Sequence, residues 1–190
     1  EFLFDLDGTL ASYQQHIMQA LKQYLPDNVN FDFVSEQKYP QYVWNVLSLI
    51  KNQPGFWEQL PIVPEGLELF NLCKMYGNIQ VLTQGPINHP SAWMEKLKWV
   101  QNHLNPLVDY EVPVTITRDK SRFYGHILVE DYPDYIEAWL SKRPRGKVII
   151  IDTPYNRSYK HNRCIRYRGV VDNSKIKAFL EREANIRANQ

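Results

Sequence analysis

The chain opens on the stretch Phe2-Leu3-Phe4-Asp5-Leu6-Asp7-Gly8-Thr9-Leu10. A short apolar run that ends at a turn predicts a buried strand, and open α/β sheets bind ligands just past the carboxyl ends of such strands. Asp5 and Asp7 stand at that position and are separated by one residue. Two carboxylates so close repel each other, and a divalent cation or a shared proton offsets the repulsion. The pair is therefore a candidate metal site; the alternative is a loop with two solvated acids.

Length, charge and cysteine content narrow the class of protein. The 190 residues suffice for one α/β core with a modest insertion. The net charge is +1 with both signs interspersed, which favours neither a nucleic-acid nor a membrane partner, and no apolar run reaches membrane-spanning length. The two cysteines, Cys73 and Cys164, are expected to be free thiols in a reducing compartment, which predicts a cytoplasmic enzyme.

Residues 11–76 have a helical pattern between the first strand and the next one, Ile79 to Thr83. The apolar residues recur at helical spacing in three stripes: Ile17, Leu21 and Tyr24; Val43, Val46, Leu47 and Ile50; Leu69, Leu72, Cys73 and Tyr76. No strand is predicted inside this segment. We therefore expect a core made of residues 1–10 and 77–190, with residues 11–76 inserted as a helical unit.

Four more strands are predicted downstream, over 114–120, 125–131, 147–152 and 164–171, and the last of them is expected at a sheet edge. Thr83 ends its strand with a hydroxyl that, with a free backbone N–H beside it, suits a phosphate oxygen. Lys120 offers a compact positive charge that suits a position between two anions.

Glu130 and Asp131 are the last two residues of the strand predicted over 125–131. Adjacent residues on a strand point to opposite faces, so we expect Asp131 to bind a metal directly and Glu130 to bind it through water.

A helix is predicted over 91–104, with an apolar stripe of Trp93, Leu97, Val100 and Leu104 and with Lys96 at its edge. Further helices are predicted over 135–140 and 174–186.

These motifs, taken in order, resemble those of the haloacid dehalogenase (HAD) superfamily. The resemblance implies that Asp5 is the nucleophile and Asp7 the general acid and base. It also implies phosphate contacts from Thr83 and Lys120, with Arg118 as the alternative to Lys120. A Mg²⁺ ion would be held by Asp5, Asp7, Asp131 and Glu130. The implied fold is α/β, a HAD-like Rossmannoid three-layer sandwich with a parallel central sheet, and residues 11–76 would be its small α-helical cap.

The aromatic residues of this segment have two possible roles. They are Tyr13, Tyr24, Phe31, Phe33, Tyr42, Trp44, Phe56 and Trp57. A small helical cap needs large side chains for its own core, but a nucleobase is a flat apolar ligand that stacks on rings. Tyr13, Phe56, Trp57 and Trp44 are the candidates for a base pocket.

A narrower resemblance is to the 5'(3')-deoxyribonucleotidase family. It rests on FWEQL at 56–60, VPEG at 63–66, EKLKWVQNHL at 95–104, TITRDK at 115–120, ILVED at 127–131 and the Tyr-Asn-Arg turn at 155–157. It implies an active-site role for Lys96, a base-pocket role for Tyr13, and phosphate contacts from the backbone amides of Leu6 and Gln84. The sequence departs from that family at Thr9, Gln84 and Glu130, where valine, serine and aspartate are common, and in the cap before Phe56.

The prediction is a Mg²⁺-dependent phosphomonoester hydrolase that acts through an aspartyl-phosphate on (deoxy)nucleoside monophosphates. One alternative is a HAD phosphatase or mutase for a phosphosugar or another small metabolite. The other is a non-catalytic binding protein with the same fold, which should have lost one of Asp5, Asp7, Lys120 or Asp131. A homodimer is left open.

Overall fold

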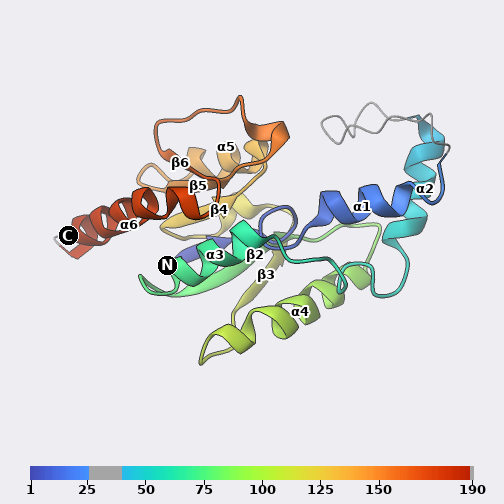
Figure 1. Cartoon of the computed structure of the whole chain (residues 1–190), viewed down its shortest axis with the longest axis horizontal. Helices are drawn as coiled ribbons and strands as arrows, with labels where there is room; N and C mark the ends of the chain where they lie inside the picture. The colour runs from blue at the N-terminus through green and yellow to red at the C-terminus, as the bar shows by residue number, and fades with distance from the viewer. Residues whose placement is uncertain (26–39, 189–190) are drawn as a thin grey trace.

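The computed structural model describes residues 1–25 and 40–188. Its centre is one parallel sheet of six strands in the order β3-β2-β1-β4-β5-β6 (Figure 1). The strands are β1 (Phe2–Phe4), β2 (Ile79–Gln84), β3 (Val114–Thr117), β4 (Ile127–Glu130), β5 (Lys147–Ile151) and β6 (Cys164–Tyr167). The predicted parallel α/β sheet is confirmed, and β6 is an edge strand as expected.

Alternating side chains of the central strand β1 enter two different apolar clusters. Leu3 packs with Trp139 and Leu140 on one face of the sheet. Phe2 and Phe4 belong to the larger cluster on the other face. A strand covered on both faces is apolar throughout, which is why the opening run Phe2 to Phe4 has no polar member.

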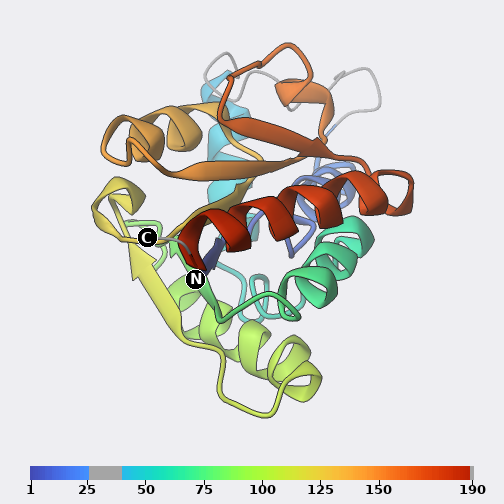
Figure 2. The same cartoon turned by 90° about the vertical axis from the view of Figure 1, so that its left-hand side faces the viewer.

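The helices form layers on the two faces of the sheet (Figure 2). They are α1 (Tyr13–Leu21), α2 (Gln41–Lys51), α3 (Pro64–Cys73), α4 (Ser91–His103), α5 (Pro133–Ser141) and α6 (Asn173–Ala188). Buried residues of α3, α4 and α6 join the larger cluster, whereas those of α5 join the smaller one. The three-layer arrangement follows from this division.

The helix α3 lies inside the segment predicted as a cap, yet it packs on the sheet. The rings of Phe70 and Phe4 meet edge to face, with their centroids 5.6 Å apart. Gly66 approaches the loop after β1 so closely that a Cβ would stand 1.9 Å from the carbonyl oxygen of Thr9. The division into a core and a cap of residues 11–76 stays a prediction, and within it α3 belongs with the layer that covers the sheet.

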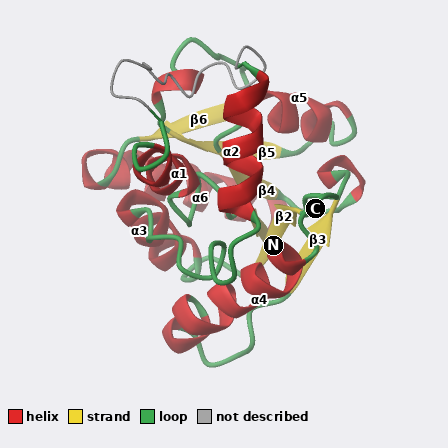
Figure 3. Cartoon of the chain, turned by 90° about the vertical axis from the view of Figure 1, so that its right-hand side faces the viewer, coloured by secondary structure: helices red, strands yellow, loops and turns green. Residues whose placement is uncertain are grey.

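The helices α1 and α2 extend beyond the carboxyl ends of the strands, and α2 crosses in front of the sheet in Figure 3. Their predicted apolar stripes are confirmed for the buried side chains of Ile17, Leu21, Val43, Leu47 and Ile50. The stripe position given to Tyr24 is wrong, because α1 ends at Leu21 and the Tyr24 side chain is 54% exposed. The cap candidates Phe31 and Phe33 lie outside the described residues.

The predicted apolar stripe over 91–104 is confirmed for Val100 and Leu104, which are buried, and wrong for its first two members. Trp93 and Leu97 are 38% and 41% exposed, whereas Glu95 and Lys96 are buried beside Trp99. The predicted strands over 114–120 and 164–171 are too long, because β3 ends at Thr117 and β6 ends at Tyr167. None of the helices in residues 1–25 and 40–188 combines the length and the apolar composition of a membrane span.

Candidate active site

The loop after β1 brings both of its carboxylates to one end of the sheet. The carbonyl oxygen of Leu6 accepts hydrogen bonds from the N–H groups of Thr9, Leu10 and Ala11, which closes a tight turn. Gly8 has φ +92°, and a Cβ there would stand 2.2 Å from Asp131 Oδ2. Only glycine fits that conformation and that close approach. The turn therefore brings the first loop against the end of β4.

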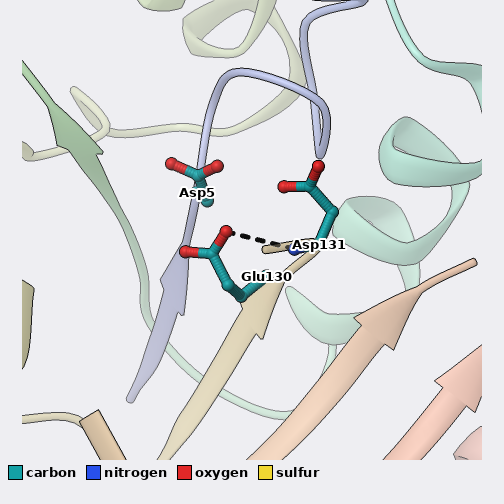
Figure 4. A group of neighbouring side chains, drawn as sticks. All are labelled: Asp5, Glu130 and Asp131. Atoms are coloured by element: carbon teal, nitrogen blue, oxygen red, sulfur yellow. Dashed lines mark hydrogen bonds between the residues drawn. The ribbon is translucent and has the colours of Figure 1, made fainter. Parts of the chain in front are cut away.

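The sheet register explains why Asp5 meets Glu130 and Asp131. Phe4 lies opposite Val129 of β4, and the Asp5 N–H donates to the Val129 carbonyl oxygen over 2.9 Å. Asp5, Glu130 and Asp131 thus end neighbouring strands, and one carboxylate oxygen from each lies within 4.8 Å of the others (Figure 4). All three residues are buried.

Lys120 compensates part of this negative charge. Its Nζ lies 2.5 Å from Asp5 Oδ1 and 2.7 Å from Glu130 Oε2. Burial by itself would lower the pKa of Lys120, but the carboxylates of Asp5 and Glu130 raise it above its usual value. The ammonium group therefore stays charged. Arg118, the alternative candidate, is exposed and donates to the Gly85 carbonyl oxygen instead.

The carboxylates near Lys120 still resist ionisation. Burial raises the pKa of Asp5 to about 6; the Glu130 charge adds to the rise and Lys120 opposes it. Burial, with the charges of Glu130 and Asp5, also raises the pKa of Asp131 well above its usual value. Burial is the first cause of both pKa shifts, and the charges of the neighbouring carboxylates are the second.

Glu130 is held by the backbone as well as by Lys120. Its Oε1 accepts hydrogen bonds from the N–H groups of Asp131 and Tyr132, each over 3.1 Å. Its other oxygen pairs with Lys120. Both carboxylate oxygens of Glu130 therefore have partners within the protein.

Asp7 pairs with a second lysine. Lys96 of α4, only 1% exposed, forms an ion pair with Asp7 Oδ2. The same Nζ donates to the Gln84 carbonyl oxygen over 2.6 Å and to Thr83 Oγ1 over 3.3 Å. Burial raises the pKa of Asp7, against the opposing charge of Lys96. Lys96 thus joins the ends of β1 and β2.

Three polar side chains outside the predicted site residues surround Asp131. Tyr155 donates its hydroxyl hydrogen to Asp131 Oδ2, and Gln14 Nε2 lies 3.5 Å from the same oxygen. Asn156, fully buried after β5, donates to the carbonyl oxygens of Asp131 and Ile151, both over 2.8 Å. The sequence holds two signals for the Tyr155-Asn156 turn: its position past the carboxyl end of a parallel strand, and its place in the narrower family resemblance.

The donor set fits a hard divalent cation. The three buried carboxylates offer oxygen ligands, which Mg²⁺ and Ca²⁺ prefer. Counting Asp7, four carboxylates face the two ammonium groups of Lys96 and Lys120. The acids therefore outnumber the lysines, and a divalent cation would balance the negative charge that remains when they ionise.

The aromatic candidates of the predicted cap gather beside Lys96. The rings of Tyr13 and Trp57 stack with centroids 5.4 Å apart and planes 5° from parallel. Phe56 meets both rings edge to face. The Nζ of Lys96 lies 4.8 Å from the centroid of the Trp57 ring. Trp44, the fourth candidate, lies on α2 and is partly buried against the larger of the two apolar clusters of the fold.

The chain is similar to known proteins along most of its length. The family model described as "5' nucleotidase, deoxy (Pyrimidine), cytosolic type C protein" matches residues 2–178. A "Putative 5'(3')-deoxyribonucleotidase" of Bordetella pertussis is 31% identical over 162 residues, which cover 82% of this chain and 84% of that protein. The mitochondrial 5'(3')-deoxyribonucleotidase of Mus musculus is 23% identical over 92% of this chain and 86% of its own length.

Solved structures share the fold at low sequence identity. A haloacid dehalogenase-like family hydrolase from Xanthomonas campestris aligns with TM-score 0.55 and 13% identity, covering 97% of this chain and 96% of that one. The "putative HAD-hydrolase YfnB" of Bacillus subtilis, solved with magnesium bound, also has TM-score 0.55 and 13% identity, covering 94% and 97%. The chain therefore belongs to the family of cytosolic type C 5' nucleotidases, and it is a phosphoester hydrolase with the HAD fold.

Proposed function

We propose that the chain is a Mg²⁺-dependent phosphatase that hydrolyses (deoxy)nucleoside monophosphates through an aspartyl-phosphate on Asp5. The observation that carries the proposal is the difference between two carboxylates of one loop. Asp5 lies in the buried cluster against Lys120. Asp7 pairs with Lys96 through Oδ2, and within the described residues its Oδ1 has no hydrogen-bond partner. One environment suits a nucleophile and the other suits a group that exchanges a proton.

In the first step Asp5 attacks the phosphorus in line, and the ester bond to the nucleoside breaks. The leaving oxygen takes a proton from Asp7, whose raised pKa favours the protonated form that a general acid needs. Lys120 stays charged beside the nucleophile and lowers the repulsion between two anions.

In the second step Asp7, now ionised, takes a proton from the water that attacks the aspartyl-phosphate. The bond between Asp5 and phosphorus breaks, and inorganic phosphate leaves. The Thr83 hydroxyl, the Lys96 ammonium group and the backbone N–H groups of Leu6 and Gln84 are the groups proposed to hold the phosphate oxygens through both steps.

The acidic cluster supports a Mg²⁺ cofactor held by Asp5 and Asp131, with Asp7 and Glu130 as the further candidates. When bound, Mg²⁺ would supply positive charge between the nucleophile and the phosphate. The hydrogen bonds of Thr9 and Tyr155 to Asp131 orient its carboxylate toward that position.

The nucleotide substrate is supported by the stacked rings of Tyr13 and Trp57 beside Lys96, and by the names of the relatives. Both rings are largely buried, so a flat base would pack against the margin of this aromatic group, with its phosphate toward Lys96. The proposal includes a cytoplasmic location, which the two free cysteines support.

The test is phosphate release from a panel of nucleoside monophosphates and sugar phosphates, with Mg²⁺ and then with a chelator. We expect Mg²⁺-dependent release from the nucleotides, and a loss of turnover in Asp5→Asn. Asp134→Asn, a change to an exposed acid on α5, is the matched control. Release from sugar phosphates alone would contradict the nucleotide substrate, and full activity of Asp5→Asn would contradict the mechanism.

A further inference from the structure

Glu95 is a buried carboxylate outside the acidic cluster, and both of its oxygens are used. The side chain sits on the inner face of α4 and is 6% exposed. Oε1 accepts a hydrogen bond from the Gly55 N–H over 3.0 Å, and Oε2 accepts one from the Trp57 N–H over 3.0 Å. One carboxylate of α4 therefore holds both ends of the turn Gly55-Phe56-Trp57.

This arrangement needs a carboxylate. Burying a charged group is costly unless hydrogen bonds compensate, and hydrogen bonds from backbone N–H groups to a carboxylate are among the stronger ones. A glutamine would offer one oxygen, and its NH₂ group would face the second N–H. Gly55, with φ +82°, allows the turn to present both N–H groups to the same side chain.

The turn determines where the Trp57 ring lies. The indole Nε1 donates to the Lys51 carbonyl oxygen over 3.1 Å, and the ring stacks on Tyr13. Lys96, the residue after Glu95, lies over the same ring and pairs with Asp7. Neighbouring residues of α4 thus hold the aromatic turn and the proton-transfer group.

We propose that Glu95 is a positioning residue for the nucleoside part of the substrate. It holds the Gly55-Phe56-Trp57 turn so that the rings of Trp57 and Tyr13 stand beside the Lys96–Asp7 pair. This inference rests on the proposed function and deepens it, because it assigns selection for a flat base to a side chain that reaches the base only through Trp57.

The test is Glu95→Gln, with Glu58→Gln as its matched control. Glu58 also joins this region to α4, but its pair with Lys98 spans 3.4 Å and both side chains are partly exposed. Such exposed pairs contribute little. The measurements are KM and kcat for a deoxynucleoside monophosphate and for glycerol phosphate, and amide hydrogen exchange in the segment 55–57.

We expect Glu95→Gln to raise KM for the nucleotide about tenfold, as for the loss of one charged hydrogen bond, with kcat within roughly twofold. Values for glycerol phosphate stay unchanged, exchange at Gly55 and Trp57 becomes faster, and Glu58→Gln matches the parent protein. In a Trp57→Ala background, Glu95→Gln adds no further rise in KM, because the effect passes through Trp57.

Equal nucleotide KM in Glu95→Gln and Glu58→Gln would overturn the inference. Equal losses for both substrates would also overturn it, since they indicate general damage. If the parent protein releases phosphate from glycerol phosphate but not from nucleotides, the proposed function fails. Amide exchange then tests the positioning alone, and unchanged rates at Gly55 and Trp57 would refute it.

Discussion

The two lysine–aspartate pairs of the site differ in their burial and in the charged groups around them. Lys120 and Asp5 are 3% and 5% exposed at the side chain and share their pocket with Glu130. Lys96 is equally buried, but Asp7 is 22% exposed and uses one oxygen for the pair. Two carboxylates separated by Leu6 are therefore in different electrostatic environments.

The comparison teaches that the surroundings of each carboxylate, more than its residue type, separate nucleophile from acid. Asp5 is held among fixed charges, which suits a group that must approach phosphorus from one direction. Asp7 can exchange a proton with a leaving oxygen or with water. Substitutions at the two aspartates and the two lysines should therefore have different effects.

The largest effect is expected from Asp5→Asn. The amide keeps the shape of the side chain but cannot form the acyl-phosphate, so kcat should fall by at least about 10⁴-fold. The fall should be the same for nucleotides and for an aryl phosphate. Steady-state phosphate release measures it, and circular dichroism checks the fold. A variant with a kcat near that of the parent protein would contradict the assignment of the nucleophile.

Asp7→Asn should lower kcat by roughly 10²- to 10⁴-fold for a nucleotide, the usual contribution of a general acid or base. For an aryl phosphate the leaving phenolate needs no proton, so the first step is spared and a burst of phenolate should precede slow turnover. Rapid-mixing absorbance records the burst. Loss of the burst along with turnover would mean that Asp7 does not differ from Asp5 in role.

The two lysines should differ in their effect on stability. Lys120→Met leaves Asp5 and Glu130 buried without their cation and should cost about 3 kcal/mol of unfolding free energy near neutral pH. Lys96→Met also removes a cation, but the Asp7 side chain is 22% exposed, so the cost should be smaller, about 1 kcal/mol. Urea unfolding of both variants gives the two values. Equal losses of unfolding free energy would contradict the expected difference between the two pairs.

The smallest effect is a pH-dependent response to Mg²⁺. In the folded chain, the pKa of Asp5 is raised from 3.8 to about 6. At a pH between these two values, the folded chain therefore binds more protons than the unfolded chain. Stability of the metal-free protein therefore falls as pH rises through this interval, by about 3 kcal/mol from Asp5. We expect Mg²⁺ to raise Tm by roughly 5 °C near pH 7.5 and by less near pH 5.

Thermal unfolding with and without Mg²⁺ at both pH values measures this response. The Asp131→Asn variant, which loses a proposed ligand, should show a smaller shift at the higher pH. An equal rise in Tm at both pH values would mean that the cation does not relieve the charge of the acidic cluster.

The sequence determined the parts of this protein that local pattern controls. The run Phe2 to Phe4 predicts a strand covered on both faces, and the order of the acidic, hydroxyl and lysine motifs predicts which strand ends carry polar groups. The carboxyl ends of parallel strands lie at the same edge of a sheet. The sequence pattern therefore suffices to assign Asp5, Thr83 and Asp131 to one site.

Only the tertiary structure decided which face of α4 is buried and which side chains support Asp131. Periodicity favours Trp93 and Leu97 as the inner face because it counts apolar residues, but Glu95 and Lys96 are buried because the Gly55-Phe56-Trp57 turn and Asp7 satisfy them. Likewise, the buried Asn156 bonds to Asp131 and Arg166, which lie 25 and 10 residues away from it in the chain. Burial of a polar group depends on partners brought by the fold, and no local window of sequence contains them.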